Sequence, residues 1–117
     1  MVYTNTQPIT AFKGLGLYPE FVVYDEDGTA RDITNDVVTF RVFDAYDTAL
    51  ATLDTDDSAE IEKTNAEGGN IRVKLEPSVL DAVTAYTTAK FILYSTFDGE
   101  STFLGSNRFT LRPDPTA

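Results

Sequence analysis

The segment Val37-Val-Thr-Phe-Arg-Val-Phe43 alternates between apolar side chains and Thr or Arg. Successive side chains of a strand point to opposite faces of its sheet. Val38, Phe40 and Val42 therefore share one face, and the polar residues between them share the other. This period of two predicts a half-buried strand, with one face in a core and one face toward solvent.

The same alternation extends to both sides of this segment. In the stretch 70–75, Ile71, Val73 and Leu75 are expected to point inward, and the charged residues between them outward. In the longest expected strand, 86–97, Ala89, Phe91 and Leu93 share one face, and the other face holds Lys90, Ile92 and Tyr94. Further strands are predicted at 21–24, 50–53, 59–63, 101–104 and 108–112.

Turn signals separate these runs. Glycines end the segments 25–28 and 65–69, and a third turn is expected at Asp98-Gly99, because glycine adopts the positive φ that tight hairpin turns require. The glycine of the segment 105–107 is expected to break or bulge a strand. The segment 77–83 is the single helix candidate, since Pro77 suits the first turn of a helix.

About seven short strands with one helical turn near 77–83 predict an all-β fold, an immunoglobulin-like antiparallel β-sandwich. Cys and Trp are absent, so the disulfide and buried Trp of antibody domains cannot form its centre. Packing of Phe40, Phe91 and Phe109 across the two sheets is expected to replace them. The expected organisation is an N-terminal arm at 1–13, the sandwich at 14–112 and a C-terminal tail at 113–117.

The composition excludes several classes of function. The 117 residues include no His and no Cys, and 19 acidic against 9 basic residues give a net charge of -10. Nucleic-acid binders neutralise phosphates with Lys and Arg, and anionic membranes also attract basic segments, so neither partner is expected. Without His or Cys, the usual general bases, nucleophiles and zinc ligands are missing. We therefore expect no enzymatic activity and no cofactor.

The run from Val23-Tyr-Asp-Glu-Asp-Gly28 through Val37-Val-Thr-Phe-Arg-Val-Phe-Asp44 resembles the opening of small phage virion modules. Examples are the N-terminal domain of phage baseplate upper proteins and stand-alone domains associated with capsids or tails. Their pattern is a strand, then Asp-x-Asp-Gly-Thr, Asp-Leu-Thr-Gly-Ala and Val-Thr-Phe-x-Val. Asn35-Asp36 stands where that pattern has Gly-Ala. The resemblance covers residues 15–112 and implies a non-catalytic structural component of a virion.

Carboxylates are concentrated between residues 44 and 62, and this range contains no Lys or Arg. Four of them are candidate Ca²⁺ ligands, because hard cations collect loop oxygens: Asp54, Asp56, Asp57 and Glu60. The spacing is not that of an EF-hand, and the alternative interpretation is a solvated loop and edge strand kept soluble by charge. A docking face for a basic partner is a third interpretation. Asp25, Asp27 and Asp32 around Gly28 are explained by turn formation.

Aromatic residues are numerous, with six Tyr and eight Phe. Protein interfaces are enriched in such side chains, and the candidate partner-binding residues lie in the arm, in loops or at strand ends: Tyr3, Pro8, Phe12, Tyr18, Tyr46 and Tyr86. The arm is expected to add an edge strand to a neighbouring subunit. A sugar-stacking platform is the alternative interpretation.

The resemblance thus implies a virion structural protein, made in the host cytoplasm, that binds neighbouring virion subunits in many copies. Capsid decoration is the first expectation, because the domain stands alone with short arms. Attachment to a tail or baseplate is the alternative, and a carbohydrate-binding or adhesive module is the alternative from another class. The first eight residues lack the basic and apolar regions of a signal peptide.

Overall fold

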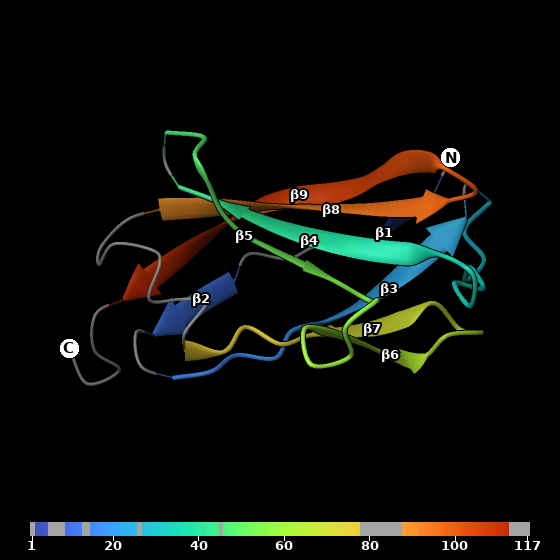
Figure 1. Cartoon of the computed structure of the whole chain (residues 1–117), viewed down its shortest axis with the longest axis horizontal. Helices are drawn as coiled ribbons and strands as arrows, with labels where there is room; N and C mark the ends of the chain where they lie inside the picture. Colours follow the sequence, from blue (N-terminus) through green and yellow to red (C-terminus); the bar gives the residue numbers. More distant parts are fainter. Residues whose placement is uncertain are drawn as a thin grey trace.

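Two β-sheets pack face to face in the computed structural model of this chain (Figure 1). The structure describes residues 2–4, 9–12, 15–25, 27–44, 46–77 and 88–112. The alternating segments of the sequence form strands, because each can bury one apolar face against the opposite sheet. No helix of these residues is long and apolar enough to span a membrane.

The first sheet has four strands in the order β1-β3-β7-β6, and all its pairings are antiparallel. Its strands are β1 (Val2–Thr4), β3 (Glu20–Asp25), β7 (Asn70–Val73) and β6 (Ile61–Asn65). The predicted turn at 65–69 joins β6 to β7, and Gly69 has a positive φ of 73°.

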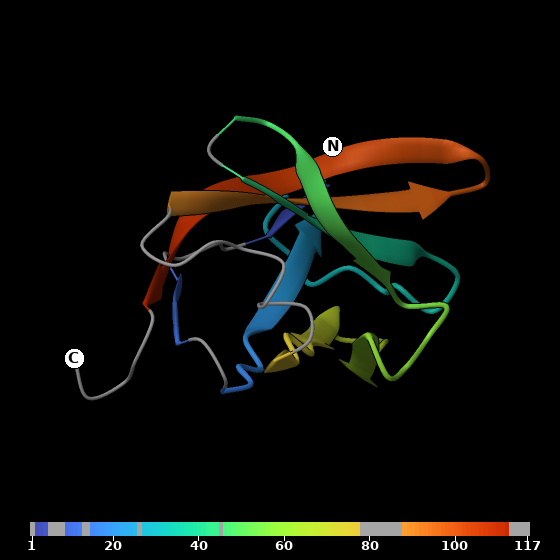
Figure 2. The same cartoon turned by 60° about the vertical axis from the view of Figure 1, so that its left-hand side comes forward.

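The second sheet has five strands in the order β2-β9-β8-β4-β5. Its strands are β2 (Ile9–Phe12), β9 (Glu100–Arg112), β8 (Thr88–Phe97), β4 (Val37–Phe43) and β5 (Ala49–Asp54). The strand β2 runs parallel to β9, and the other neighbours are antiparallel. Figure 2 shows the long β8 and β9 lying across the smaller sheet.

This order confirms the expected immunoglobulin-like β-sandwich. The strands β3, β7 and β6 lie as strands B, E and D of an immunoglobulin domain, and β9, β8, β4 and β5 lie as strands G, F, C and C′. The two short strands β1 and β2 bring the described strands to nine, against about seven expected.

The N-terminal segment pairs with the chain's own sheets. The backbone of β1 pairs Val2 with Asp25 of β3, and that of β2 pairs Ile9 with Phe109 of β9. In the structure these two strands of the predicted arm are therefore engaged within the chain rather than extended toward a neighbouring subunit. Of the predicted helical turn, Pro77 is described, and 78–83 lies outside the described residues.

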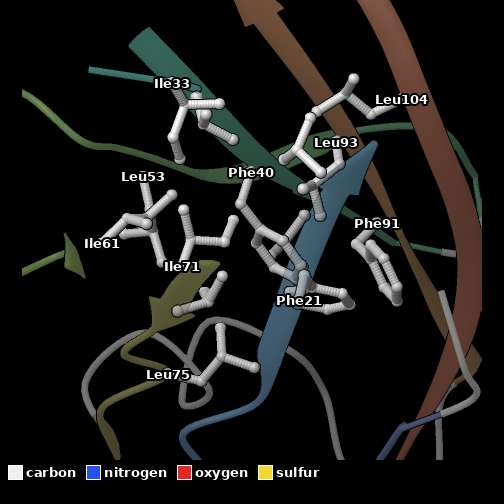
Figure 3. Close-up of a cluster of buried hydrophobic side chains, with 14 of the residues drawn as sticks. Phe21, Ile33, Phe40, Leu53, Ile61, Ile71, Leu75, Phe91, Leu93 and Leu104 are labelled. Atoms are coloured by element: carbon white, nitrogen blue, oxygen red, sulfur yellow. The ribbon is translucent and has the colours of Figure 1, made fainter. Parts of the chain in front are cut away.

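Three phenylalanines form the centre of the core (Figure 3). The rings of Phe40 and Phe91 stack with centroids 4.8 Å apart, and Phe21 lies 6.3 Å from the first ring and 5.9 Å from the second. The predicted contact between Phe40 and Phe91 is confirmed, and β3 supplies a third ring from the opposite sheet. The side chain of Phe109 lies outside the described residues.

The core extends along both sheets through branched side chains. The inward positions predicted from the alternation are buried in β4, β7 and β8. The buried hydrophobic residues are Phe21, Val23, Ile33, Val38, Phe40, Val42, Leu53, Ile61, Ile71, Val73, Leu75, Ala89, Phe91, Leu93 and Leu104.

Gly105 bulges its strand and does not break it. The backbone of β9 continues from Glu100 to Arg112, and Leu93 pairs with Gly105 while Tyr94 pairs with Phe103. The extra residue in β9, Leu104, is buried in the core. A bulge shifts the alternation by one position, so Phe103 faces away from the core although Leu104 faces into it.

Gly69→Ala is expected to lower the free energy of unfolding by about 2 kcal/mol, because strained backbone and a steric clash add. A Cβ at Gly69 would lie 2.5 Å from the carbonyl oxygen of Val23 and 2.8 Å from that of Arg31. Urea denaturation measures the loss. The matched control is Gly28→Ala, where φ is +88° but nothing lies within 4 Å. Equal losses in the two variants would show that the close backbone approach is unimportant.

Candidate functional site

The outer side of the five-stranded sheet carries apolar side chains at its centre. We call Phe43 of β4, Ile92 and Tyr94 of β8 and Phe103 of β9 the outer apolar face. Tyr94 pairs directly with Phe103, and Phe43 pairs with Lys90, two residues from Ile92. Side chains at opposed positions on one face of a sheet contact each other. The four residues therefore form a band across three adjacent strands.

This band is unusual for a surface exposed to water. Antiparallel sheets with one solvated side normally place polar residues on that side. Phe103 is 57% exposed, and Phe43, Ile92 and Tyr94 are half-buried. A contiguous apolar surface on an otherwise highly charged chain is typical of a binding site.

A shallow depression lies at one end of the outer apolar face. It has a volume of about 260 Å³ and is lined by Phe43, Asp47, Lys90 and Ile92. Asp47 has a positive φ of 65° in the turn that follows β4, and its carboxylate forms an ion pair with Lys90. Tyr46, in the same turn, is 89% exposed.

Three basic residues lie on the same outer side: Arg41, Lys90 and Arg108. The alternation of β4 places Arg41 outward, opposite Ile92 of β8, and Lys90 pairs with Arg108 of β9. The guanidinium carbon of Arg41 lies 5.2 Å from the centre of the Phe43 ring, a cation–π contact. The outer apolar face is therefore accompanied by positive charge, in a chain with a net charge of -10.

The four-stranded sheet has a different outer surface at β6 and β7. Arg72 pairs with Glu20 at 2.9 Å and with Glu62 at 3.9 Å, and Lys74 pairs with Glu62 at 3.6 Å. Exposed pairs of this kind contribute little to stability, but they mark a surface that is satisfied within the chain and hydrated. The two outer sides of the sandwich are thus chemically distinct.

An ion pair between the buried Asp36 and the partly buried Arg31 fixes the loop between β3 and β4. Asp36 is 2% exposed and accepts hydrogen bonds from Arg31 Nε at 2.8 Å and from the Ser95 hydroxyl at 3.1 Å. The hydrogen bond with Asp36, more than that with Asp25, raises the pKa of Arg31 above its usual range. Lys63 Nζ also donates to the Asp36 carbonyl at 2.6 Å. All these groups have partners, so we assign the network a structural role.

Three of the four predicted calcium candidates accept backbone hydrogen bonds within their own loop, and the fourth, Asp56, is exposed. Asp54 accepts from the backbone N–H of Asp56 at 2.9 Å, Asp57 accepts from that of Ala59 at 2.9 Å, and Glu60 accepts from that of Asp54 at 3.3 Å. In the described part of the chain, no three acidic side chains converge as a cation site requires.

The acidic residues near Gly28 also form turns. Thr29 donates from its hydroxyl and backbone N–H to Asp27, and Thr34 donates in the same way to Asp32. These hydrogen bonds favour the charged carboxylates and lower the pKa of both Asp27 and Asp32. The turn interpretation of these residues agrees with this geometry.

The predicted partner-binding residues do not converge in one place. Tyr18 is about half exposed and donates its hydroxyl to Glu76 at 3.1 Å, which raises the pKa of Tyr18. Tyr46 is almost fully exposed and directly precedes Asp47, which lines the depression. The side chains of Tyr3 in β1 and Phe12 in β2 lie outside the described residues, as do Pro8 and Tyr86.

Sequence reasoning missed the outer apolar face. The alternation correctly placed Ile92 and Tyr94 away from the core. Two apolar side chains on an outward face were the signal that could have revealed the outer apolar face. Phe103 could not be added to them, because the bulge at Leu104 decides which way it points.

No protein-family model matches the sequence, and the search of curated proteins gave no match. Among solved structures, the chain is similar to a chain from a structure described as the structural basis of T cell specificity and activation by the bacterial superantigen toxic shock syndrome toxin-1. The TM-score is 0.54 at 9% identity, over 95% of this chain and 98% of that chain.

Two further structures give similar values. The periplasmic chaperone SfaE matches with a TM-score of 0.50 at 10% identity, over 97% of this chain and 57% of that chain. Murine CRIg matches with a TM-score of 0.49 at 9% identity, over 97% of this chain and 98% of that chain. At such identities these likenesses concern the fold alone, which is immunoglobulin-like.

Proposed function

We propose that this chain is a non-catalytic binding module whose outer apolar face docks onto a protein partner. The observation that carries the proposal is Phe103, which is 57% exposed on the outer side of β9, directly opposite Tyr94 of β8. Burying such aromatic side chains against a partner removes apolar area from water. Aromatic residues surrounded by arginine are also the composition typical of the centre of protein interfaces.

The non-catalytic part of the proposal rests on chemistry. The sequence contains no His and no Cys, and the carboxylates Asp54, Asp57 and Glu60 are engaged with backbone amides. General acid–base catalysis needs a group whose pKa and position suit proton transfer. The outer apolar face offers hydrophobic contact and positive charge, which suit recognition.

We place this binding in a phage particle, with the capsid as the first candidate and the tail or baseplate as the second. The support is the resemblance of residues 15–112 to virion modules. In a symmetric particle many copies bind at once, so a modest interface in each copy is sufficient for stable attachment.

Phe103→Asp is expected to reduce attachment to the particle at least about 30-fold, because losing an aromatic anchor of an interface costs about 2 kcal/mol or more, and the new carboxylate would also have to be desolvated. The assay is co-sedimentation of the tagged chain with virions in a density gradient, at increasing chain concentration. The matched control is Leu15→Asp, since Leu15 is 50% exposed and lies in the segment before β3.

The control variant should sediment with virions as the wild-type chain does. Equal attachment of Phe103→Asp and wild type would contradict the role of the outer apolar face. A wild-type chain that never sediments with virions would contradict the virion setting.

Carbohydrate binding is the second candidate function, favoured by Tyr46, which is 89% exposed in the turn that also carries Asp47 of the shallow depression. A solvent-exposed ring can stack on a sugar. A glycan array separates the two candidates. Binding of the wild-type chain that is lost in Tyr46→Ala and kept in Phe103→Asp would favour the carbohydrate function.

A further inference from the structure

Arg41 occupies the middle of the outer side of the five-stranded sheet. It lies on β4 between Ile92 of β8 and Thr52 of β5, and its guanidinium carbon is 5.2 Å from the Phe43 ring. The residue is half-buried, and the aromatic ring shields one side of the cation from water. A partner that covers the outer apolar face therefore also covers Arg41.

The guanidinium of Arg41 is not fully satisfied within the described part of the chain. Its Nε atom is buried without a hydrogen-bond partner, and no carboxylate of the described residues pairs with it. Other cations of the chain do have carboxylate partners: Arg31, Arg72, Lys74 and Lys90. A buried polar atom without a partner is rare in folded proteins and calls for an explanation. Within the described residues, no ion pair joins Arg41 to a carboxylate, although the sequence contains 19 acidic residues.

The charge of the surface indicates the chemistry of the partner. Arg41 lies beside the apolar band, and the carboxylate among the described residues that line the depression, that of Asp47, is already paired with Lys90. Complementary charge steers association and fixes register. In a two-fold symmetric dimer through this face, the same basic patch would meet itself. A second copy therefore fits less well than an acidic partner.

We propose that the partner presents a carboxylate to Arg41, within a protein segment whose apolar side chains cover Phe43, Ile92, Tyr94 and Phe103. This inference rests on the proposed function, because it names the partner chemistry of the same face. Arginine binds carboxylates through two parallel hydrogen bonds. The interaction becomes stronger when the partner excludes water from it.

The test is a selection of random linear peptides on the immobilised wild-type chain. The peptides enriched should carry Asp or Glu flanked by apolar residues, and their affinity should fall as salt rises. Arg41→Gln should weaken the best peptide about 30-fold, since a hydrogen bond between charged groups is lost. The matched control is Arg72→Gln, which removes the same charge from the four-stranded sheet and should leave affinity unchanged.

Several outcomes would overturn the inference. Enriched peptides without acidic residues, or peptides that bind Arg41→Gln as well as wild type, would refute the carboxylate even where Phe103→Asp abolishes binding. In that case the proposed function still stands. Peptides that bind Phe103→Asp normally would refute the proposed function as well.

Self-association gives a further check. A selection that enriches nothing would contradict the inference, and so would sedimentation equilibrium that shows a dimer dissociated by Phe103→Asp. The second result would mean that another copy of the chain covers the face. The urea midpoints of Arg41→Gln and wild type should agree, which shows that the fold is intact.

Discussion

Phe91→Ala is expected to lower the free energy of unfolding by about 4 kcal/mol, the largest loss expected for a single substitution in this chain. Phe91 is fully buried, stacks on Phe40 at 4.8 Å and lies 5.9 Å from Phe21. Alanine would leave a cavity between the two sheets at the point where three rings meet. Urea denaturation of both proteins gives the difference.

The matched control is Phe103→Ala, which removes the same side chain from the outer side of the same sheet. Because Phe103 is largely exposed in the free chain, its loss is expected to change the free energy of unfolding by less than about 1 kcal/mol. The pair thus tests the assignment of the two faces. Similar losses in Phe91→Ala and Phe103→Ala would mean that Phe103 also packs in the core.

Asp36→Ala is expected to cost about 3 kcal/mol, because it leaves the Arg31 guanidinium partly buried without its main acceptor. The Ser95 hydroxyl, which donates to the same carboxylate at 3.1 Å, also loses its acceptor. The loop between β3 and β4 would lose its attachment to β8. Thermal and urea unfolding measure this loss.

Two further variants isolate the ion pair. Asp56→Ala is the control, since Asp56 is exposed and its carboxylate accepts no described hydrogen bond, and it should be nearly neutral. The double variant Asp36→Ala with Arg31→Ala should lose less than the sum of the single losses, by about 1 kcal/mol or more. Additive losses would contradict a direct coupling of the two side chains.

The strands from β3 to β9 could be predicted from the sequence because alternation reports burial directly. Ile71 and Val73 are buried as expected, and Gly28 and Gly99 adopt the positive φ that their turns required. These features depend on neighbouring residues alone. The fold class followed from them, since several alternating segments separated by tight turns leave few arrangements.

Other features depend on contacts between distant parts of the chain. The strands β1 and β2 are short, so their pairing with β3 and β9 could not be read from their own residues. Asp36 meets Ser95 across 59 positions, and no local pattern marks such a pair.

The outer apolar face escaped prediction for the same reason. Its band forms when the bulge at Leu104 turns Phe103 outward beside Tyr94. The predicted partner-binding residues were selected by their position along the chain, in loops or at strand ends. The register between strands, however, decides which side chains lie together on the surface of a sheet.

Hydroxyl-radical footprinting of the chain, free and bound to the peptide most enriched by the wild-type protein, tests the binding surface most directly. We expect Phe103 and Tyr94 to become protected on binding, while Tyr18 and Phe97, exposed elsewhere on the molecule, keep their reactivity. Protection of Tyr18 or Phe97 with Phe103 unchanged would contradict the account, because the partner would then occupy another surface.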